Sequence, residues 1–162
     1  LAAAPTLQQA FPGITIDAQV SRSMYAAPGI LQAQLDAGAL RSVVVLALGT
    51  NGPITRDTLE LVRSMIGPDR QLVVVNAQAP RGWVPGVNAE LSSFARSYRD
   101  VEMANWHDAI QPSLELLARD QIHFGSSGAL VFATSIRDAL QRLAELPPLR
   151  DESADLSLPT PF

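Results

Sequence analysis

The chain has 162 residues, the length of one globular domain, and it has no cysteine, which excludes disulfides, thiolate metal sites and a cysteine nucleophile. Its 47% apolar and 17% charged residues are typical of a folded protein, and two histidines are too few for a His-rich metal centre, so we expect no metal and no cofactor. The net charge is −4 and the arginines are dispersed along the chain, which argues against a nucleic-acid partner.

The first part of the chain predicts a helix, a strand and a second helix. Residues 1–10 have the composition of a helix, and Ile14–Ala18 follows the Pro12-Gly13 turn as a short strand. Ile30–Ala37 predicts a helix that Gly38 closes.

The middle of the chain predicts two buried strands joined by a helix. Ser42–Leu48 and Gln71–Asn76 are β-branched and continuous, a pattern typical of parallel strands covered on both faces. No aliphatic run here or elsewhere approaches the ~20 residues of a membrane-spanning helix. Between the strands, Thr55–Ile66 has apolar residues at helical spacing, and Gly67 ends it. Strand, helix and strand form a βαβ unit with a right-handed crossover.

The second half continues the alternation of helices and strands. A Pro-rich loop over Pro80–Pro85 precedes a helix over Asn88–Arg99 and a strand over Val101–Trp106. The last helix, from Ser126 to about Glu145, carries an apolar stripe and ends before Pro147-Pro148.

These elements predict a three-layer α/β/α, flavodoxin-like domain with a parallel sheet. Only four strands are visible, whereas such a sheet has five in the order 2-1-3-4-5, so we expect the first strand to be missing from the chain, upstream of Leu1. Residues 1–146 are predicted to form the domain and residues 147–162 a Pro-rich acidic tail.

One polar candidate follows the strand Ser42–Leu48, at the end where ligands of parallel sheets bind. Gly49-Thr50-Asn51-Gly52 lets the backbone turn sharply and brings Asn51 to the crevice. An Asn carboxamide donates N–H groups without carrying charge, which suits an oxyanion hole. An ordinary loop, in which Asn tolerates a left-handed conformation, explains this motif equally well.

A second candidate is Asp120-Gln121-Ile122-His123, where the spacing places both side chains on one face of a helical turn and lets the Asp orient the imidazole. The alternative is a surface His near a helix cap. His107, next to Asp108, is a weaker candidate because it lacks such a setting.

A nucleophile is harder to place. Ser126 and Ser127 are near His123, but we expect one of them to cap the last helix, while Ser21 and Ser23 lack the sequence of a nucleophile elbow.

Together these residues resemble the SGNH family of hydrolases and acyltransferases. That family has the same fold, with a nucleophile in G-D-S after the first strand, an Asn in G-x-N after the middle strand and D-x-x-H before the last helix. Gly49-Thr50-Asn51 and Asp120–His123 match the latter two motifs in order and context. G-D-S is absent, so the nucleophilic Ser is expected upstream of Leu1, not in these 162 residues.

A closer similarity is to the SGNH-like extracytoplasmic domain of bacterial membrane O-acyltransferases, including the type that O-acetylates peptidoglycan. The residues that carry this likeness are Asp17-Ala18 with Ser21-Arg22, Val44–Gly52, Val74–Trp83, Asn88, Asn105-Trp106 and Asp120–His123. The family often has Asp-Trp at the position of Asn105-Trp106, a modest departure.

The resemblance implies serine-dependent O-acyl transfer through an acyl-enzyme. His123 would be the general base and acid, Asp120 would hold it, and Asn51 would bind the oxyanion. Gly49 and Thr50 would line the substrate site. Arg22 would position substrate there, although an ion pair with Asp17 or Asp36 explains it equally well. Trp83 and Trp106 could stack on a sugar, with packing as the default role for each.

The implied partners are an acyl donor, an envelope polysaccharide as acceptor, and a membrane acyltransferase domain in the same full-length chain, on the extracytoplasmic face of the bacterial membrane. Two alternatives stay open: an SGNH esterase or deacetylase, and an inactive SGNH-like module that binds glycan or a partner.

Overall fold

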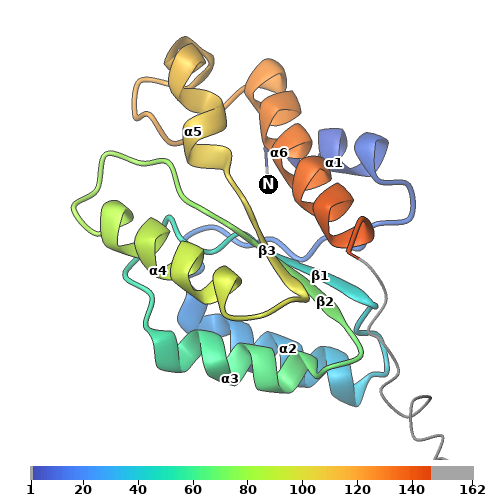
Figure 1. The fold of residues 1–162 in the computed structure, drawn as a ribbon. Helices are drawn as coiled ribbons and strands as arrows, with labels where there is room; N and C mark the ends of the chain where they lie inside the picture. The colour runs from blue at the N-terminus through green and yellow to red at the C-terminus, as the bar shows by residue number, and fades with distance from the viewer. Residues whose placement is uncertain (1, 147–162) are drawn as a thin grey trace, which may run out of the picture.

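In the computed structural model, which describes residues 2–146, a parallel sheet lies between two layers of helices (Figure 1). Strands β1 (Val43–Leu46), β2 (Gln71–Val75) and β3 (Val101–Ala104) are paired in the order β1-β2-β3. One face is covered by α2 (Ala27–Asp36), α3 (Arg56–Ile66) and α4 (Val84–Arg96), and the other by α1 (Ala4–Ala10), α5 (Trp106–Ile110) and α6 (Ser126–Ala144). Short 3₁₀ helices η1 (Met24–Ala26) and η2 (Gln111–Leu116) precede α2 and follow α5. The predicted three-layer α/β fold is confirmed.

The central strand β2 divides the core in two. Leu72 and Val74 pack with the helices α2, α3 and α4, whereas Val73 and Val75 pack with α5 and α6. All four side chains are buried, because alternate residues of a strand point to opposite faces and both faces are covered. Because both faces of β2 are covered, its sequence is continuously apolar and does not alternate, as the prediction of a doubly covered strand required.

The predicted strand at Ile14–Ala18 is wrong: these residues belong to no strand of the sheet. In the order 2-1-3-4-5 this segment pairs only with the first strand, and no such strand exists among residues 2–146. A strand is defined by its ladder of hydrogen bonds, so the segment has no partner with which to form one. β1 is consequently an edge strand, half-buried along its whole length.

Several helix boundaries differ from the predictions for local reasons. α2 and α4 begin three and four residues earlier than predicted, each with a proline in its first turn, where the missing N–H is not needed. Trp106, predicted to end a strand, instead begins α5, which Asn105 caps. α3 and α6 match the prediction closely, and Thr55 caps α3 by accepting a hydrogen bond from Thr58 N.

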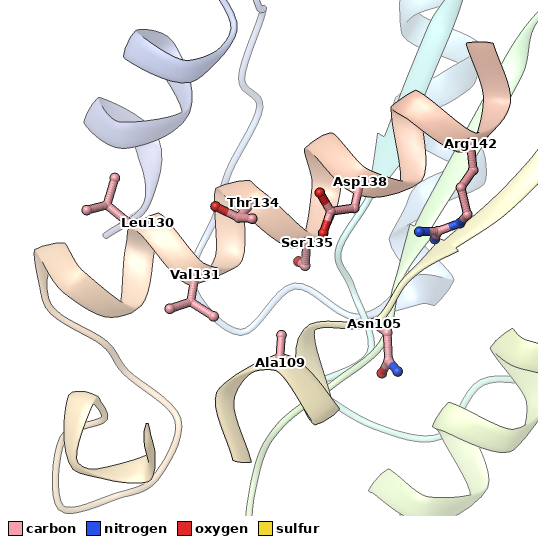
Figure 2. A pocket seen from close by; sticks show the side chains of 8 residues that line it. All are labelled: Asn105, Ala109, Leu130, Val131, Thr134, Ser135, Asp138 and Arg142. Atoms are coloured by element: carbon pink, nitrogen blue, oxygen red, sulfur yellow. The ribbon is translucent and has the colours of Figure 1, made fainter. Parts of the chain in front are cut away.

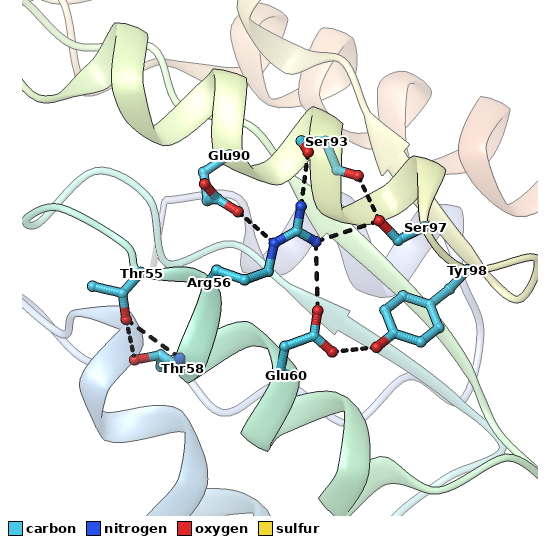
Figure 3. A network of polar contacts seen from close by, with 8 residues as sticks. All are labelled: Thr55, Arg56, Thr58, Glu60, Glu90, Ser93, Ser97 and Tyr98. Atoms are coloured by element: carbon cyan, nitrogen blue, oxygen red, sulfur yellow. Dashed lines mark hydrogen bonds and ion pairs between the residues drawn. The ribbon is translucent and has the colours of Figure 1, made fainter.

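A polar network fastens α3 to α4 (Figure 3). Arg56 pairs with Glu90 at 2.8 Å and donates to Ser93 at 2.7 Å, and Glu60 accepts a hydrogen bond from the Tyr98 hydroxyl. That hydrogen bond, together with burial, raises the pKa of Tyr98. The network fastens α3 to α4 from outside the apolar core.

At the other edge of the sheet, Arg142 from α6 covers β3. Its Nε pairs with Glu102 at 2.9 Å and its Nη2 donates to the main-chain oxygen of Met103, also at 2.9 Å. The side chain thus satisfies a carbonyl that points away from β2. Within the described range, no helix is long and apolar enough to span a membrane, and the predicted tail, 147–162, lies outside the described residues.

Candidate active site

The Asp120–His123 motif lies in a closed loop between η2 and α6. Gln121 N donates to Ala118 O at 2.8 Å, Ala118 N donates to His123 O at 2.6 Å, and Leu117 pairs with Phe124 in an antiparallel bridge. Gln121 has φ +56°, which no right-handed helix contains. The prediction of a helical turn is therefore wrong, and a tight turn brings the two side chains together instead.

Within this loop, Asp120 holds His123 through both carboxylate oxygens. His123 Nδ1 lies 2.7 Å from Oδ2, while Oδ1 accepts from the main-chain N–H groups of Ile122 at 3.0 Å and His123 at 3.1 Å. These hydrogen bonds lower the pKa of Asp120 from 3.8 to about 2. The bond with the His123 imidazole has the largest effect, and the bonds from the two main-chain N–H groups follow. A carboxylate beside Nδ1 favours the tautomer with its proton there, which leaves Nε2 as a base. The His123 side chain is 74% exposed.

Packing on both flanks of His123 fixes the loop. Ile122 joins the core on the α2–α3–α4 face, and Phe124 joins the core on the α5–α6 face, where its ring lies 5.2 Å from Trp106 and 5.6 Å from Phe132. Gly128 of α6 permits this contact, because a Cβ there would lie 2.6 Å from Phe124 Cβ. The loop therefore crosses the end of the sheet and presents the imidazole outward.

The predicted oxyanion residue, Asn51, follows β1. Its Nδ2 donates to the main-chain oxygen of Arg22 at 3.1 Å, and its side chain is exposed. Gly52 has φ +129°, as a sharp turn requires, whereas Gly49 is needed for close packing: a Cβ there would lie 2.9 Å from Val87 Cγ1. Val87 belongs to the apolar core cluster against which Ile122 packs. Met24, which follows Arg22 by two residues, belongs to the same cluster.

Of the other predicted residues, Trp83 and Arg22 lie next to Asn51. The Trp83 indole donates to Thr50 O at 3.3 Å and remains 38% exposed. Arg22 forms the ion pair with Asp17 that the sequence offered as an alternative, at 2.8 Å. Trp106 is only 4% exposed and lies in the aromatic cluster under Phe124.

His107 is placed differently from His123. Its main-chain N–H donates to Asn76 Oδ1 at 2.8 Å, and its buried Nδ1 has no hydrogen-bond partner among the described residues. The neighbouring Asp108 is bound by Asn105 Nδ2 at 2.6 Å instead. The lower rank given to His107 agrees with this absence of a carboxylate partner.

None of the serines in the described part of the chain donates a hydrogen bond to His123. Ser126 and Ser127 are exposed at the start of α6, whose N-cap is Gly125 with no side-chain bond. The expected serine cap is therefore wrong, because the chain enters the helix one residue before the first serine.

Asn88 and Asn76 also position this end of the sheet, and the sequence did not assign them this role. Asn88 donates to Ala77 O and accepts from Ala77 N, at 2.9 and 2.8 Å, so it ties α4 to the chain leaving β2. Asn76 donates to Asn105 Oδ1 at 2.7 Å and links the ends of β2 and β3. The position of Asn76 as the last residue of a predicted strand was the available signal for its role.

Two surface cavities lie away from the motif residues. One of about 310 Å³ lies between α5 and α6 (Figure 2) and another of about 740 Å³ follows the edge of β3, and neither is lined by Asn51, Asp120 or His123. The candidate site is instead an open surface at the carboxyl end of the sheet, and residues 2–146 contain no cluster of side chains that could hold a metal ion.

A parallel α/β/α domain with an Asn after a sheet strand and a hydrogen-bonded Asp–His pair before its last helix is the arrangement of an SGNH-like hydrolase or acyltransferase domain. No protein-family model matches the chain. It is homologous to the peptidoglycan O-acetyltransferase OatA of Listeria monocytogenes, with 29% identity over 138 residues, and to the putative peptidoglycan O-acetyltransferase YrhL of Bacillus subtilis, with 27% identity over 135 residues.

These alignments cover 85% and 83% of the chain but 22% and 21% of the relatives, so the chain spans about a fifth of their length. Its structure matches the C-terminal catalytic domain of Streptococcus pneumoniae OatA, solved with a methylsulfonyl adduct. The TM-score is 0.81 at 27% identity, and the match covers 90% of this chain and 89% of that one.

Proposed function

We propose that the chain belongs to the catalytic domain of a peptidoglycan O-acetyltransferase, which transfers an acetyl group through a serine acyl-enzyme. The observation that carries this proposal is the 2.7 Å contact between His123 Nδ1 and Asp120, with the imidazole presented to solvent from a loop packed on both flanks. The homology to named peptidoglycan O-acetyltransferases supports acetyl as the group and peptidoglycan as the acceptor.

In the proposed reaction, His123 Nε2 takes the proton of a serine hydroxyl as the serine oxygen attacks the acyl carbonyl. The negative charge that develops on the carbonyl oxygen is stabilised by an N–H of Asn51. His123 then gives the proton to the departing oxygen, and the acyl-enzyme remains. In the second half, His123 takes a proton from a glycan hydroxyl as the glycan oxygen attacks the same carbonyl. His123 then returns the proton to the serine oxygen as its bond to the acyl carbon breaks.

Asp120 supports both halves by staying ionised. Because hydrogen bonding from His123 and from two main-chain N–H groups holds the pKa of Asp120 at about 2, its carboxylate is present throughout the pH range in which an imidazole titrates. It fixes the Nδ1 proton and stabilises the imidazolium that forms in each half-reaction.

The parts that this mechanism needs beyond these residues are proposals from the resemblance. The nucleophile is a serine in a G-D-S motif preceding Leu1, and the acyl donor reaches it from a membrane acyltransferase domain of the same full-length protein, on the extracytoplasmic face. Residues 1–146 are proposed to form the SGNH-like catalytic domain without its first strand and its G-D-S segment. Trp83 is proposed to contact the acceptor through its exposed edge, beside Gly49 and Thr50.

Hydrolysis is a second candidate, favoured by the exposure of the imidazole: the His123 side chain is 74% exposed and therefore accessible to water. An esterase releases free acetate, whereas a transferase places it on the glycan. The two are separated by incubating the full-length protein with p-nitrophenyl acetate and soluble peptidoglycan glycan fragments, and measuring acetylated fragments against acetate.

The triad assignment is tested by His123→Ala in the full-length protein. Loss of the general base is expected to lower the rate of p-nitrophenyl acetate cleavage at least ~100-fold, within the ~10²–10⁴ of acid–base catalysis. His107→Gln is the matched control and should retain the activity. An unchanged rate in His123→Ala would sink the assignment, and no cleavage by the unmodified protein would favour an inactive binding module.

A further inference from the structure

We infer that Arg22 is a positioning residue: it folds residues 17–22 into a closed loop whose Arg22 carbonyl sets the orientation of the Asn51 carboxamide. The inference rests on the proposed role of Asn51 in the oxyanion hole. It assigns Arg22 a different task from the substrate contact suggested by the sequence.

The guanidinium of Arg22 closes the loop through three hydrogen bonds. Nη1 donates to Asp17 Oδ1 at 2.8 Å and to Asp17 O at 3.3 Å, and Nη2 donates to Gln19 Oε1 at 3.0 Å. The Arg22 side chain is 13% exposed. Ser21, inside the loop, has φ +59°, a conformation that costs a non-glycine residue energy and persists only where its surroundings impose it.

The same residue contacts Asn51 through its main chain. Asn51 Nδ2 donates to Arg22 O at 3.1 Å, and this is the one hydrogen bond that holds the Asn51 side chain within the described part of the chain. Since a carbonyl oxygen can only accept a hydrogen bond, the Arg22 carbonyl requires the Nδ2 edge of the Asn51 carboxamide, not the Oδ1 edge, to face the Arg22 loop. If the amide flipped, Oδ1 would face the Arg22 carbonyl and the two oxygens would repel each other.

This arrangement leaves one Nδ2 hydrogen for the oxyanion. An amide carries two N–H groups on the same nitrogen, and the Arg22 carbonyl uses one of them. The second then has a fixed direction, which is what electrostatic preorganisation requires. A direct contact of Arg22 with substrate agrees less well with the structure, because the side chain is largely buried and both terminal nitrogens are engaged.

A double-mutant cycle in the full-length protein tests this role. Arg22→Met is expected to lower kcat for p-nitrophenyl acetate by ~10-fold with KM within about twofold, and Asn51→Ala to lower it by ~10²–10³-fold. In the Asn51→Ala background, Arg22→Met should cost less than about twofold further, since Arg22 acts through Asn51. Arg41→Met, at an exposed arginine before β1, is the matched control and should leave kcat unchanged.

An equal tenfold loss in both backgrounds, or a loss that falls on KM, would overturn the inference. Asp17→Asn removes the charge of the carboxylate that pairs with Arg22. Because the Asp17 side chain is 48% exposed, this substitution endangers folding less than Arg22→Met does, and it should lower kcat by less than ~10-fold.

A second measurement does not depend on activity. In ¹H–¹⁵N NMR spectra, the two Asn51 side-chain protons should be separated by their different bonding, and Arg22→Met should reduce that separation while Arg41→Met leaves it. If the unmodified protein cleaves no ester, the proposed function fails while this result still stands. If Arg22→Met is folded and leaves the Asn51 signals unchanged, the positioning role is refuted.

Discussion

Replacing Gly128 by Ala is expected to destabilise the fold, although Ala is the better helix former. The added Cβ would lie 2.6 Å from Phe124 Cβ and 3.3 Å from Leu116 O. Both neighbours are main-chain atoms or directly attached to the main chain, so neither can swing aside, and the whole loop that carries His123 must shift. Overpacking of this kind costs about 1–3 kcal/mol, and the rigid neighbours place it near 3. The helix preference of Ala over Gly returns up to about 1 kcal/mol.

The net loss of about 2 kcal/mol corresponds to a fall in Tm of roughly 4–8 °C for a domain of this size. Circular dichroism melts at fixed pH measure it. The chain offers two matched controls: Gly29 and Gly86 also occupy the third position of their helices, α2 and α4, and a Cβ at either meets nothing within 4 Å. Gly29→Ala and Gly86→Ala should raise Tm by a few degrees. If Gly128→Ala raised Tm as they do, the proposed support of the His123 loop by α6 would be refuted.

Two further predictions concern polar groups at the same end of the sheet. Because His123 is the largest cause of the lowered pKa of Asp120, a ¹³C NMR titration should find the Asp120 carboxyl midpoint near 2 and find it raised in His123→Ala. The stabilisation that the Asp120 carboxylate gives to the folded loop is therefore complete above about pH 4 and is lost as the pH falls through about 2. An Asp120 midpoint that did not move in His123→Ala would contradict the hydrogen bond. Asn88→Leu leaves the N–H and C=O of Ala77 unpartnered in a buried position and should lower the free energy of unfolding in urea by about 2–4 kcal/mol, whereas a loss under about 0.5 kcal/mol would show that water replaces the amide.

The parts of the fold that were predicted correctly depend on local patterns. The β-branched run Gln71–Asn76 and the apolar stripe on Ser126–Glu145 indicate directly which side chains are buried. The spacing and type of the apolar residues depend on which faces of the element are covered. Ile14–Ala18 has an equally plausible local pattern, but a strand also needs a neighbour, and that depends on the topology of the whole sheet. Trp106 suits both a strand end and a helix start, and the cap from Asn105 decides between them.

In the candidate site, too, local spacing predicted some features, while others depend on the rest of the fold. The three-residue spacing of Asp120 and His123 correctly predicted their contact, since a helix and a tight turn both bring such residues together. The turn itself is decided by hydrogen bonds that close the loop from Ala118 to His123 and by the fit of Phe124 over Gly128. Arg22 was equally ambiguous, because an arginine near a crevice serves an ion pair or a ligand, and only the distance to Asp17 separates the two.

The contact of Arg142 with β3 makes the two edges of the sheet unequal. On β3, an incoming strand would have to displace a guanidinium from the Met103 carbonyl and separate it from Glu102 before pairing could begin. On β1, no side chain of residues 2–146 bonds to the main chain, so pairing there breaks no existing bond. Among residues 2–146, pairing of a further strand with the sheet is therefore unobstructed at β1 and obstructed at β3.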